Sequence, residues 1–469
     1  MSWLASLLYP TLQNLQRHTS RRDFLREERL QKKLRSENLA FLQSYSFSQA
    51  VEYANRMAQL SPGFRRHLEA AGVPLPIPED HDVWSRIPMM TKTQIKDNPE
   101  AWYTVPVDAP ALHWTSTSGS TGQPFRCPID QSSMTAEIIA NELNLKAVGW
   151  RPHFKEAVFK VRGNPPQGMR RVFRTMMGNI PLMYASRQMF PASVPGVIEE
   201  LRNAKVELLR GYPTTLVMFA IEMLKLKIPC HIPIIVTIGE QLTAAGAVTI
   251  EKAFQGKVYR DYGASEAQHI AFECRKQDGY HIDLTRYYLE LMNGDTPVKP
   301  GETGEIVITA FRNGAMPLVR YCIGDLATMH DDNDSCPCGS PLPRLGEVLG
   351  RVVRVTLTPE GKQISEFFFH SFVLVLNNAH EHIARYKVLQ KDREIYEVLW
   401  VPRHERAKEH LTEIEQQILE KANVPMKISW KEVEDIPPDP SGKRGSFVPL
   451  AYDSGEGYIK KPKDDNRPQ

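Results

Sequence analysis

Some segments of the chain have apolar residues at helical spacing, and others contain short continuous apolar runs. The alternation of these two kinds of segment predicts a mixed α/β protein. Short apolar runs predict buried strands within HIPIIVTIGEQL (231–242), KVYRDYGASEA (257–267) and GETGEIVITA (301–310). Between the first two, AAGAVTIEKAFQG (244–256) predicts a helix that ends at Gly256. Because strands separated by helices form α/β units, we expect functional residues at the ends of these strands.

The pattern changes after residue 350. Residues 352–365 predict a hairpin around Pro359–Gly361, and residues 396–402 and 426–433 predict strands. Residues 406–423 predict an amphipathic helix, whose apolar side consists of Leu411, Ile414, Ile418 and Leu419. We therefore expect two domains: a large α/β domain over residues 1–350 and a small, mobile α+β domain over residues 351–469.

Composition narrows the class of protein. The chain has 469 residues, of which 42% are hydrophobic, and a formal net charge of +3, which favours neither nucleic acid nor an anionic membrane as the main partner. Six cysteines are too few for a disulfide framework, and the longest apolar run, FFFHSFVLVL, is too short to span a bilayer. We expect a cytoplasmic protein without a transmembrane segment. The segment LLYPTLQNLQ (7–16) either packs on its own domain or docks on a membrane surface.

The stretch TSTSGSTGQP (115–124) is the first candidate for chemistry. Glycine, serine and threonine offer backbone N–H groups and hydroxyls without bulk, which suits a cradle for phosphate oxygens. It is not a Walker A loop, since the Gly-Lys-Ser/Thr ending is absent. On composition alone, a plain surface linker is the competing interpretation.

This stretch resembles the phosphate loop of the adenylate-forming superfamily, which includes acyl- and aryl-CoA ligases and peptide-synthetase adenylation domains. Three further motifs follow in the family's order: YGASEA (262–267), RYCIGDLA (320–327) and PSGKRGS (440–446). FECRKQDGYHID and CPCGSPLPRLGEVLGR are similar to the branch of phenylacetate–CoA ligases and proteins of capsular-polysaccharide clusters. The resemblance implies a large adenylate-forming domain followed by a mobile C-terminal lid.

The reaction implied by this resemblance has two steps. A carboxylate attacks the α-phosphorus of ATP to give acyl-AMP and pyrophosphate, and CoA or an amine then displaces AMP. The implied cofactor-binding residues are Ser118, Gly119, Ser120, Thr121 and Gly122 for phosphates, and Gly239, Glu240, Tyr262, Gly263, Ser265, Asp325 and Arg351 for the rest of the nucleotide and the acyl pocket.

Two residues carry the implied catalytic chemistry. Glu266 would ligate Mg²⁺, and Lys443 would approach the α-phosphate when the lid closes. The competing interpretations are a surface charge and one solvated lysine among many. The chain departs from the family twice: Phe125-Arg126 follow the loop's Pro124 where a lysine is usual, and Val353 occupies the usual hinge position.

A second candidate site contains three cysteines and a histidine. Cys336-Pro-Cys338-Gly is a tight knuckle with two thiols, and Cys274 and His281 flank an upstream turn. Together they make a Cys₃His set that suits tetrahedral structural zinc and is similar to residues of the phenylacetate-ligase branch. Ordinary buried thiols and a surface histidine are the alternative.

Three functions remain open. The first is an acid–thiol ligase that makes an acyl-CoA from a carboxylic acid, ATP and CoA, with Mg²⁺ as cofactor. The second is an amide-forming ligase with an amine acceptor, and the third is a catalytically inactive nucleotide-binding assembly factor. The motifs leave the acid, the acceptor and the oligomeric state undetermined.

Overall fold

The computed structural model describes residues 21–109, 112–117, 125–151, 154–160, 182–185, 194–331, 336–351, 355–357, 363–365, 382–392, 394–422, 426–436 and 447–448. The chain groups into two compact units. One comprises Met1–Glu240, Ile250–Ile323 and Ala327–Val348, and the other comprises Gln241–Thr249, Gly324–Leu326 and Leu349–Gln469. Among the described helices, none combines the length and the apolar character that a bilayer span requires. The segments 7–16 and 367–376 lie outside the described residues.

Polar caps determine where the helices near the N-terminus begin. Asn38 accepts a hydrogen bond from the Phe41 N–H at 2.9 Å and starts α3. Ser61 caps the next helix, which has proline at its first turn, and Thr91 forms a capping box with the third residue of its helix. The helices are α2 (Arg21–Leu34), α3 (Leu39–Leu60), α4 (Pro62–Ala70), α5 (His81–Ser85), α6 (Lys92–Asp97) and the 3₁₀ turn η1 (Pro99–Ala101).

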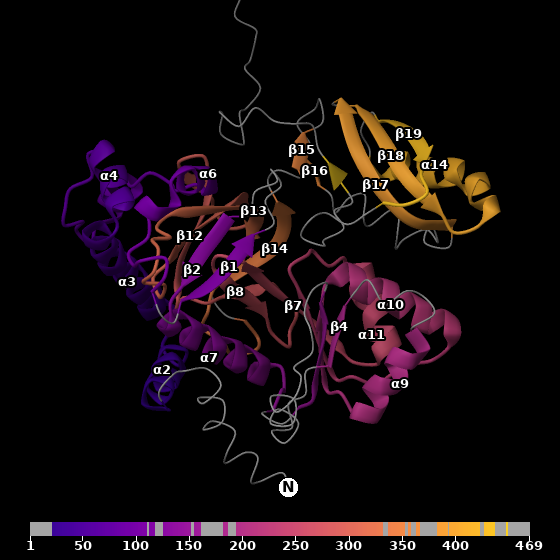
Figure 1. Cartoon of the computed structure of the whole chain (residues 1–469), viewed down its shortest axis with the longest axis horizontal. Coiled ribbons are helices and arrows are strands. Elements are labelled where there is room, and N and C mark those ends of the chain that lie inside the picture. The colour runs from indigo at the N-terminus through magenta and orange to yellow at the C-terminus, as the bar shows by residue number, and fades with distance from the viewer. Residues whose placement is uncertain are drawn as a thin grey trace, which may run out of the picture. The chain divides into compact units, whose positions relative to one another are not determined.

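A twelve-stranded mixed sheet runs through the described part of the first unit (Figure 1), in the order β11-β10-β12-β13-β14-β9-β8-β7-β6-β5-β3-β4. The strands from β4 to β7 are parallel, whereas β7 pairs antiparallel with β8. The bounds are β3 (Glu156–Lys160), β4 (Leu182–Ala185), β5 (Leu208–Gly211), β6 (Ile234–Ile238), β7 (Lys257–Ala264), β8 (Gln268–Glu273), β9 (Tyr280–Ile282), β10 (Tyr287–Asn293), β11 (Thr296–Pro297), β12 (Thr303–Ala310), β13 (Tyr321–Met329) and β14 (Arg344–Arg351).

Helices connect the parallel strands, as the alternating pattern predicted. They are α9 (Val194–Ala204), α10 (Pro213–Leu226) and α11 (Ala244–Phe254), whereas α7 (Gln131–Ala147) precedes β3. A separate hairpin of β1 (His113–Thr117) and β2 (Phe125–Ile129) flanks the glycine- and hydroxyl-rich stretch, whose residues 118–124 lie outside the described part.

The C-terminal region has its own sheet and core. β17 (Ile383–Asp392), β18 (Ile395–Pro402), β19 (Lys427–Glu432) and β20 (Phe447–Val448) form a four-stranded sheet, and α14 (Leu411–Ala422) contributes Ile414 and Ile418 to a shared core (Figure 1). The 3₁₀ helix η5 (Glu405–His410) precedes α14, and β15 (Val355–Leu357) pairs with β16 (Gln363–Ser365).

The α/β fold class predicted from the sequence is confirmed. The expected strands at 231–242, 257–267 and 301–310 are β6, β7 and β12, and the helix that ends at Gly256 is α11. The helix expected over 406–423 begins later, at Leu411, because residues 405–410 form a 3₁₀ helix that has no side-chain cap. The mobility of the C-terminal domain stays a prediction.

Candidate active site

A tight turn between β7 and β8 places Glu266. Gly263 lies on β7 just before this turn, and a Cβ atom there would come within 2.2 Å of the Gln268 carbonyl oxygen, so that only glycine fits. Gln268 itself adopts a left-handed backbone with φ of 63°, and Ala267 N–H donates to the Ala264 carbonyl at 3.2 Å. The result is a buried carboxylate at the end of a strand, since Glu266 is only 3% exposed.

The two oxygens of Glu266 have different surroundings. The hydroxyl of Tyr321, which is fully buried on β13, donates a hydrogen bond to Oε1 at 3.0 Å. Oε2 is buried and has no hydrogen-bond partner among the described residues. A buried carboxylate oxygen without a partner is costly, so this atom is suited to a cation or a water molecule. A cavity with room for about one water lies beside Glu266 and is also lined by Ser133, Gln268 and Arg312.

Glu240 lies two residues beyond the end of β6 and contacts α10. Ile238 on β6 is paired with Asp261 on β7, so the ends of both strands lie side by side. Glu240 Oε2 accepts hydrogen bonds from the Thr214 N–H at 3.2 Å and from the Thr214 hydroxyl. Thr214 lies in the first turn of α10, where the backbone N–H groups of a helix lack partners within the helix. Glu240 therefore makes a structural contact, in addition to the expected role of lining the nucleotide and acyl pockets.

The other expected nucleotide residues are spread over the two units. Tyr262 is buried, with 8% of its surface exposed, and Ser265 is exposed in the β7–β8 turn. Asp325 lies on β13 and is 8% exposed, whereas Arg351 ends β14 and only its backbone is described. The expected phosphate-loop residues Ser118, Gly119, Ser120, Thr121 and Gly122, the lid lysine Lys443 and the hinge residue Val353 lie outside the described residues.

An ionic network that joins β7, β8 and α7 could not be anticipated from the sequence. His269 on β8 contacts the carboxylates of Asp261 and Glu137, the latter at 3.2 Å. Arg286 pairs with Glu137 and, at 2.8 Å, with Asp283. The sequence does contain one indication of such a network: acidic residues and a histidine occur within apolar strands. An unpaired charge there would be very unfavourable.

The pKa values of this network follow from burial and neighbouring charge. Burial alone lowers the pKa of His269, but Asp261 and Glu137 outweigh this effect and raise it above its usual value. Burial favours the neutral form of Asp283, yet Arg286 and Arg35 lower its pKa to about 2. Asp283 is therefore an anion near neutral pH, and the two carboxylates favour the protonated form of His269.

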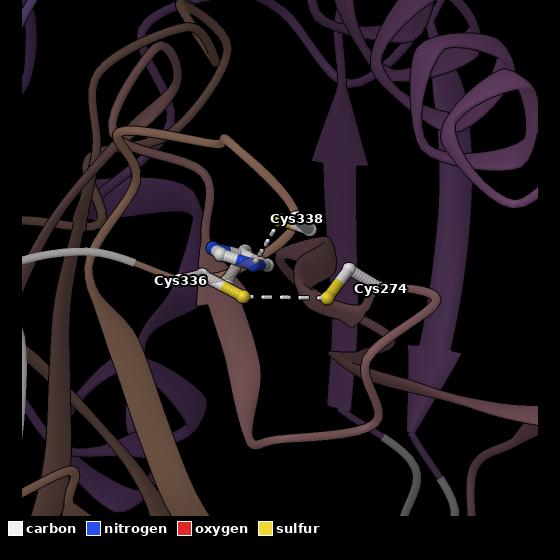
Figure 2. A group of neighbouring side chains, drawn as sticks. Cys274, Cys336 and Cys338 are labelled. Carbon is white, nitrogen blue, oxygen red and sulfur yellow. Dashed lines mark hydrogen bonds between the residues drawn. The ribbon is translucent and has the colours of Figure 1, made fainter.

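The four candidate metal ligands come together. The ligand atoms of Cys274, His281, Cys336 and Cys338 all lie within 4.8 Å of one another, and Figure 2 shows the three cysteines converging. Cys274 Sγ is 3.6 Å from Cys336 Sγ, close to the edge of about 3.8 Å expected for a tetrahedron with Zn–S bonds of about 2.3 Å.

The protonation of His281 is fixed by its neighbours. Its Nδ1–H donates to the Leu342 carbonyl at 2.9 Å, so Nε2 carries the lone pair and lies 3.3 Å from Cys338 Sγ. Burial lowers the pKa of His281 and raises the pKa of the Cys274 thiol to about 12. The cluster therefore presents a neutral imidazole beside thiols that a cation would deprotonate.

The fold is shared with solved structures of acyl-CoA ligases. The described chain matches the structure of 2-hydroxyisobutyryl-CoA ligase in complex with 2-HIB-AMP with a TM-score of 0.73 at 17% identity, over 89% of this chain and 91% of that one. It matches o-succinylbenzoate CoA synthetase from Bacillus subtilis, in complex with ATP and magnesium ion, with a TM-score of 0.51 at 16% identity, over 73% and 70% of the two chains. These structures confirm the fold.

Two sequence relatives are phenylacetate-coenzyme A ligases. The chain is 26% identical over 334 residues to phenylacetate-coenzyme A ligase from Thermus thermophilus, covering 67% of this chain and 71% of the relative. It is 26% identical over 294 residues to phenylacetate-coenzyme A ligase from Escherichia coli, covering 57% of this chain and 62% of the relative. No protein-family model matches the chain. The resemblance to the adenylate-forming superfamily, and within it to phenylacetate–CoA ligases, thus stands.

Proposed function

We propose that this protein activates a carboxylic acid with ATP and transfers the acyl group to CoA. In the first step an oxygen of the acid forms a bond to the α-phosphorus of ATP, and pyrophosphate leaves with the electrons of the broken P–O bond. In the second step the CoA sulfur, having lost its proton, attacks the acyl carbon and AMP leaves. The named activities of the relatives support this sequence of reactions.

The buried carboxylate of Glu266 is the observation that carries the proposal. One of its oxygens accepts from Tyr321 at 3.0 Å, and the other has no partner among the described residues. This arrangement fits a carboxylate that holds Mg²⁺, which prefers oxygen ligands and, when bound, neutralises the charge that builds up on a triphosphate. The similar structure of o-succinylbenzoate CoA synthetase, in complex with ATP and magnesium ion, also supports Mg²⁺ as the cofactor.

The remaining assignments come from the resemblance. Residues 118–122 bind the phosphates, Tyr262 stacks on adenine, and Ser265 contacts the α-phosphate. Asp325 accepts the two ribose hydroxyls, since a carboxylate suits a vicinal diol. Lys443 brings a positive charge to the α-phosphate once the lid closes, and Arg351, Gly239 and Glu240 complete the nucleotide and acyl pockets.

We also propose that the Cys₃His cluster binds a structural zinc ion. Three sulfurs and the Nε2 lone pair of His281 match the ligands and spacing of tetrahedral zinc. An ion held by Cys274, His281, Cys336 and Cys338 would link the end of β8 and strand β9 to the loop before β14. This cross-link stabilises the sheet beside the β7–β8 turn and takes no part in the reaction.

Pyrophosphate release with a panel of aryl, fatty and amino acids, followed by mass analysis of the product, tests the proposal. We expect one class of acid to give Mg²⁺-dependent pyrophosphate and a product heavier than CoA by the acyl group. An amide in place of the thioester would favour the amine-acceptor alternative. Nucleotide binding without pyrophosphate release from any acid would favour an inactive assembly factor and contradict the proposal.

A further inference from the structure

One side-chain contact joins two of the sequence motifs. Tyr321 belongs to RYCIGDLA and Glu266 to YGASEA, and they are 55 residues apart in the chain. The hydroxyl donates to Glu266 Oε1 at 3.0 Å, and both residues are at most 3% exposed. Water therefore does not compete with this hydrogen bond, which is stronger in buried surroundings than it would be in water.

Met90 holds the backbone immediately before and after Tyr321. Met90 N–H donates to the Arg320 carbonyl and Cys322 N–H donates to the Met90 carbonyl, each at 2.9 Å. Arg320 has φ of 45°, in the left-handed region that is unfavourable for a residue with a side chain. Three acceptors anchor its guanidinium in this conformation: the Ser85 carbonyl, the Ile87 carbonyl and the Glu290 carboxylate. The tyrosine ring consequently has a fixed position from which to donate.

This rigidity determines how Glu266 presents its carboxylate. With Oε1 bound to Tyr321, rotation of the carboxylate group would break a buried hydrogen bond. Oε2 is then the oxygen left for an additional partner, and it has none among the described residues. The arrangement resembles metal sites in which a neighbouring donor orients the ligating side chain.

We propose that Tyr321 is a positioning residue for the Mg²⁺ site, which orients Glu266 so that Oε2 points toward the ion. This inference rests on the proposed function and extends it to Tyr321, a residue to which the motifs assign no role. It requires no contact between Tyr321 and the nucleotide or the acid.

The test compares Tyr321→Phe with a matched control. Phenylalanine keeps the ring and removes only the donor. Tyr53→Phe is the control, because Tyr53 is also buried but its hydroxyl donates to backbone carbonyls, those of Asn313 and Met316, and not to the Glu266 carboxylate. Mn²⁺, used in place of Mg²⁺ with a non-hydrolysable ATP analogue, reports ion affinity by paramagnetic resonance without turnover.

We expect Tyr321→Phe to weaken Mn²⁺ binding by about 10-fold or more, as loss of a ligand-orienting partner typically does. The Mg²⁺ concentration for half-maximal pyrophosphate release should rise in parallel, while the KM for the acid stays the same. Tyr53→Phe should lower the melting temperature without changing Mn²⁺ affinity. Unchanged Mn²⁺ affinity in Tyr321→Phe, or an equal loss in both variants, would overturn the positioning role even if the wild type releases pyrophosphate normally. A wild type that turns over no acid but shows the Tyr321-specific loss of Mn²⁺ affinity would contradict the proposed function alone.

Discussion

Glu240 accepts a hydrogen bond from the backbone N–H of Thr214 at 3.2 Å and thereby caps the first turn of α10. The end of β6 is thus tied to the helix that begins two residues after Gly211, at the end of the neighbouring parallel strand β5. A negative charge at this position also interacts favourably with the helix dipole. The expected nucleotide-pocket residue therefore helps to hold two adjacent strand ends in register.

Replacing Glu240 should cost stability. We expect Glu240→Gln to lower the free energy of unfolding by about 1 kcal/mol, because the amide lacks the charge that interacts with the helix N-terminus. Urea unfolding measures this effect. Glu222→Gln, farther along α10, is the matched control and should change stability much less; equal losses in the two variants would show that the cap contributes nothing special.

The partly buried His269 should make stability depend on pH. Asp261 and Glu137 raise the pKa of His269 in the folded state, so its contribution is fully present below the unfolded-state pKa of about 6.5 and is lost as pH rises through the folded-state pKa. We expect the difference in unfolding free energy between wild type and His269→Gln to shrink as pH increases above about 6.5. Chemical denaturation across this pH range measures the difference, and a constant or growing gap would refute the interpretation.

The turn before Glu266 should not tolerate a side chain at residue 263. In Gly263→Ala the new Cβ would meet the Gln268 carbonyl at 2.2 Å, so the backbone must move and Glu266 with it. We expect a loss of about 1–3 kcal/mol in stability and a large loss of pyrophosphate release. Gly196→Ala, in α9 with open space around the added atom, should be neutral or slightly stabilising. An active Gly263→Ala enzyme would show that the turn does not position Glu266.

Freshly purified protein should contain about one zinc ion per chain. Cys274→Ser and Cys338→Ser should each lower the zinc content and the melting temperature, because either change removes a ligand of the proposed tetrahedral site. Elemental analysis and thermal unfolding measure the two effects. Cys230→Ala serves as control, since Cys230 is a free cysteine outside the cluster. Wild-type protein that contains no metal would reject the site.

Lys443 should separate catalysis from binding. We expect Lys443→Ala to abolish adenylation while leaving ATP affinity nearly intact, because the proposed lid cation stabilises charge at the α-phosphate only when the lid closes. Single-turnover formation of acyl-AMP and calorimetric titration with ATP measure the two properties. Normal acyl-AMP formation in this variant would remove the catalytic role.

Local periodicity was enough to predict many individual elements. β6 and α11 follow from an apolar run and from a helix ending at a glycine, and the buried Ile414 and Ile418 of α14 follow from helical spacing. The pairing of β14 with β9 could not be predicted in the same way, because this contact depends on which distant strands pack best rather than on local pattern. The start of α14 was predicted too early, since the charged residues before Leu411 are compatible with an α-helix as well as with the 3₁₀ helix that they form.

The site was accessible from the sequence only in part. Residue types and motif order suggested Glu266 and the four metal-ligand candidates. Neither Tyr321 as the partner of Glu266 nor His269 between two carboxylates could be anticipated, because each contact joins side chains from different elements. A polar residue in an apolar strand shows that some partner must exist but not which one.

Acid-dependent exchange of labelled pyrophosphate into ATP tests the central claim most directly, since it reports reversible acyl-AMP formation without any acceptor. We predict exchange that requires Mg²⁺ and one class of carboxylic acid, proceeds without CoA, and is lost in Glu266→Gln. Exchange that proceeds equally well in Glu266→Gln, or none with any acid although the nucleotide binds, would contradict the account.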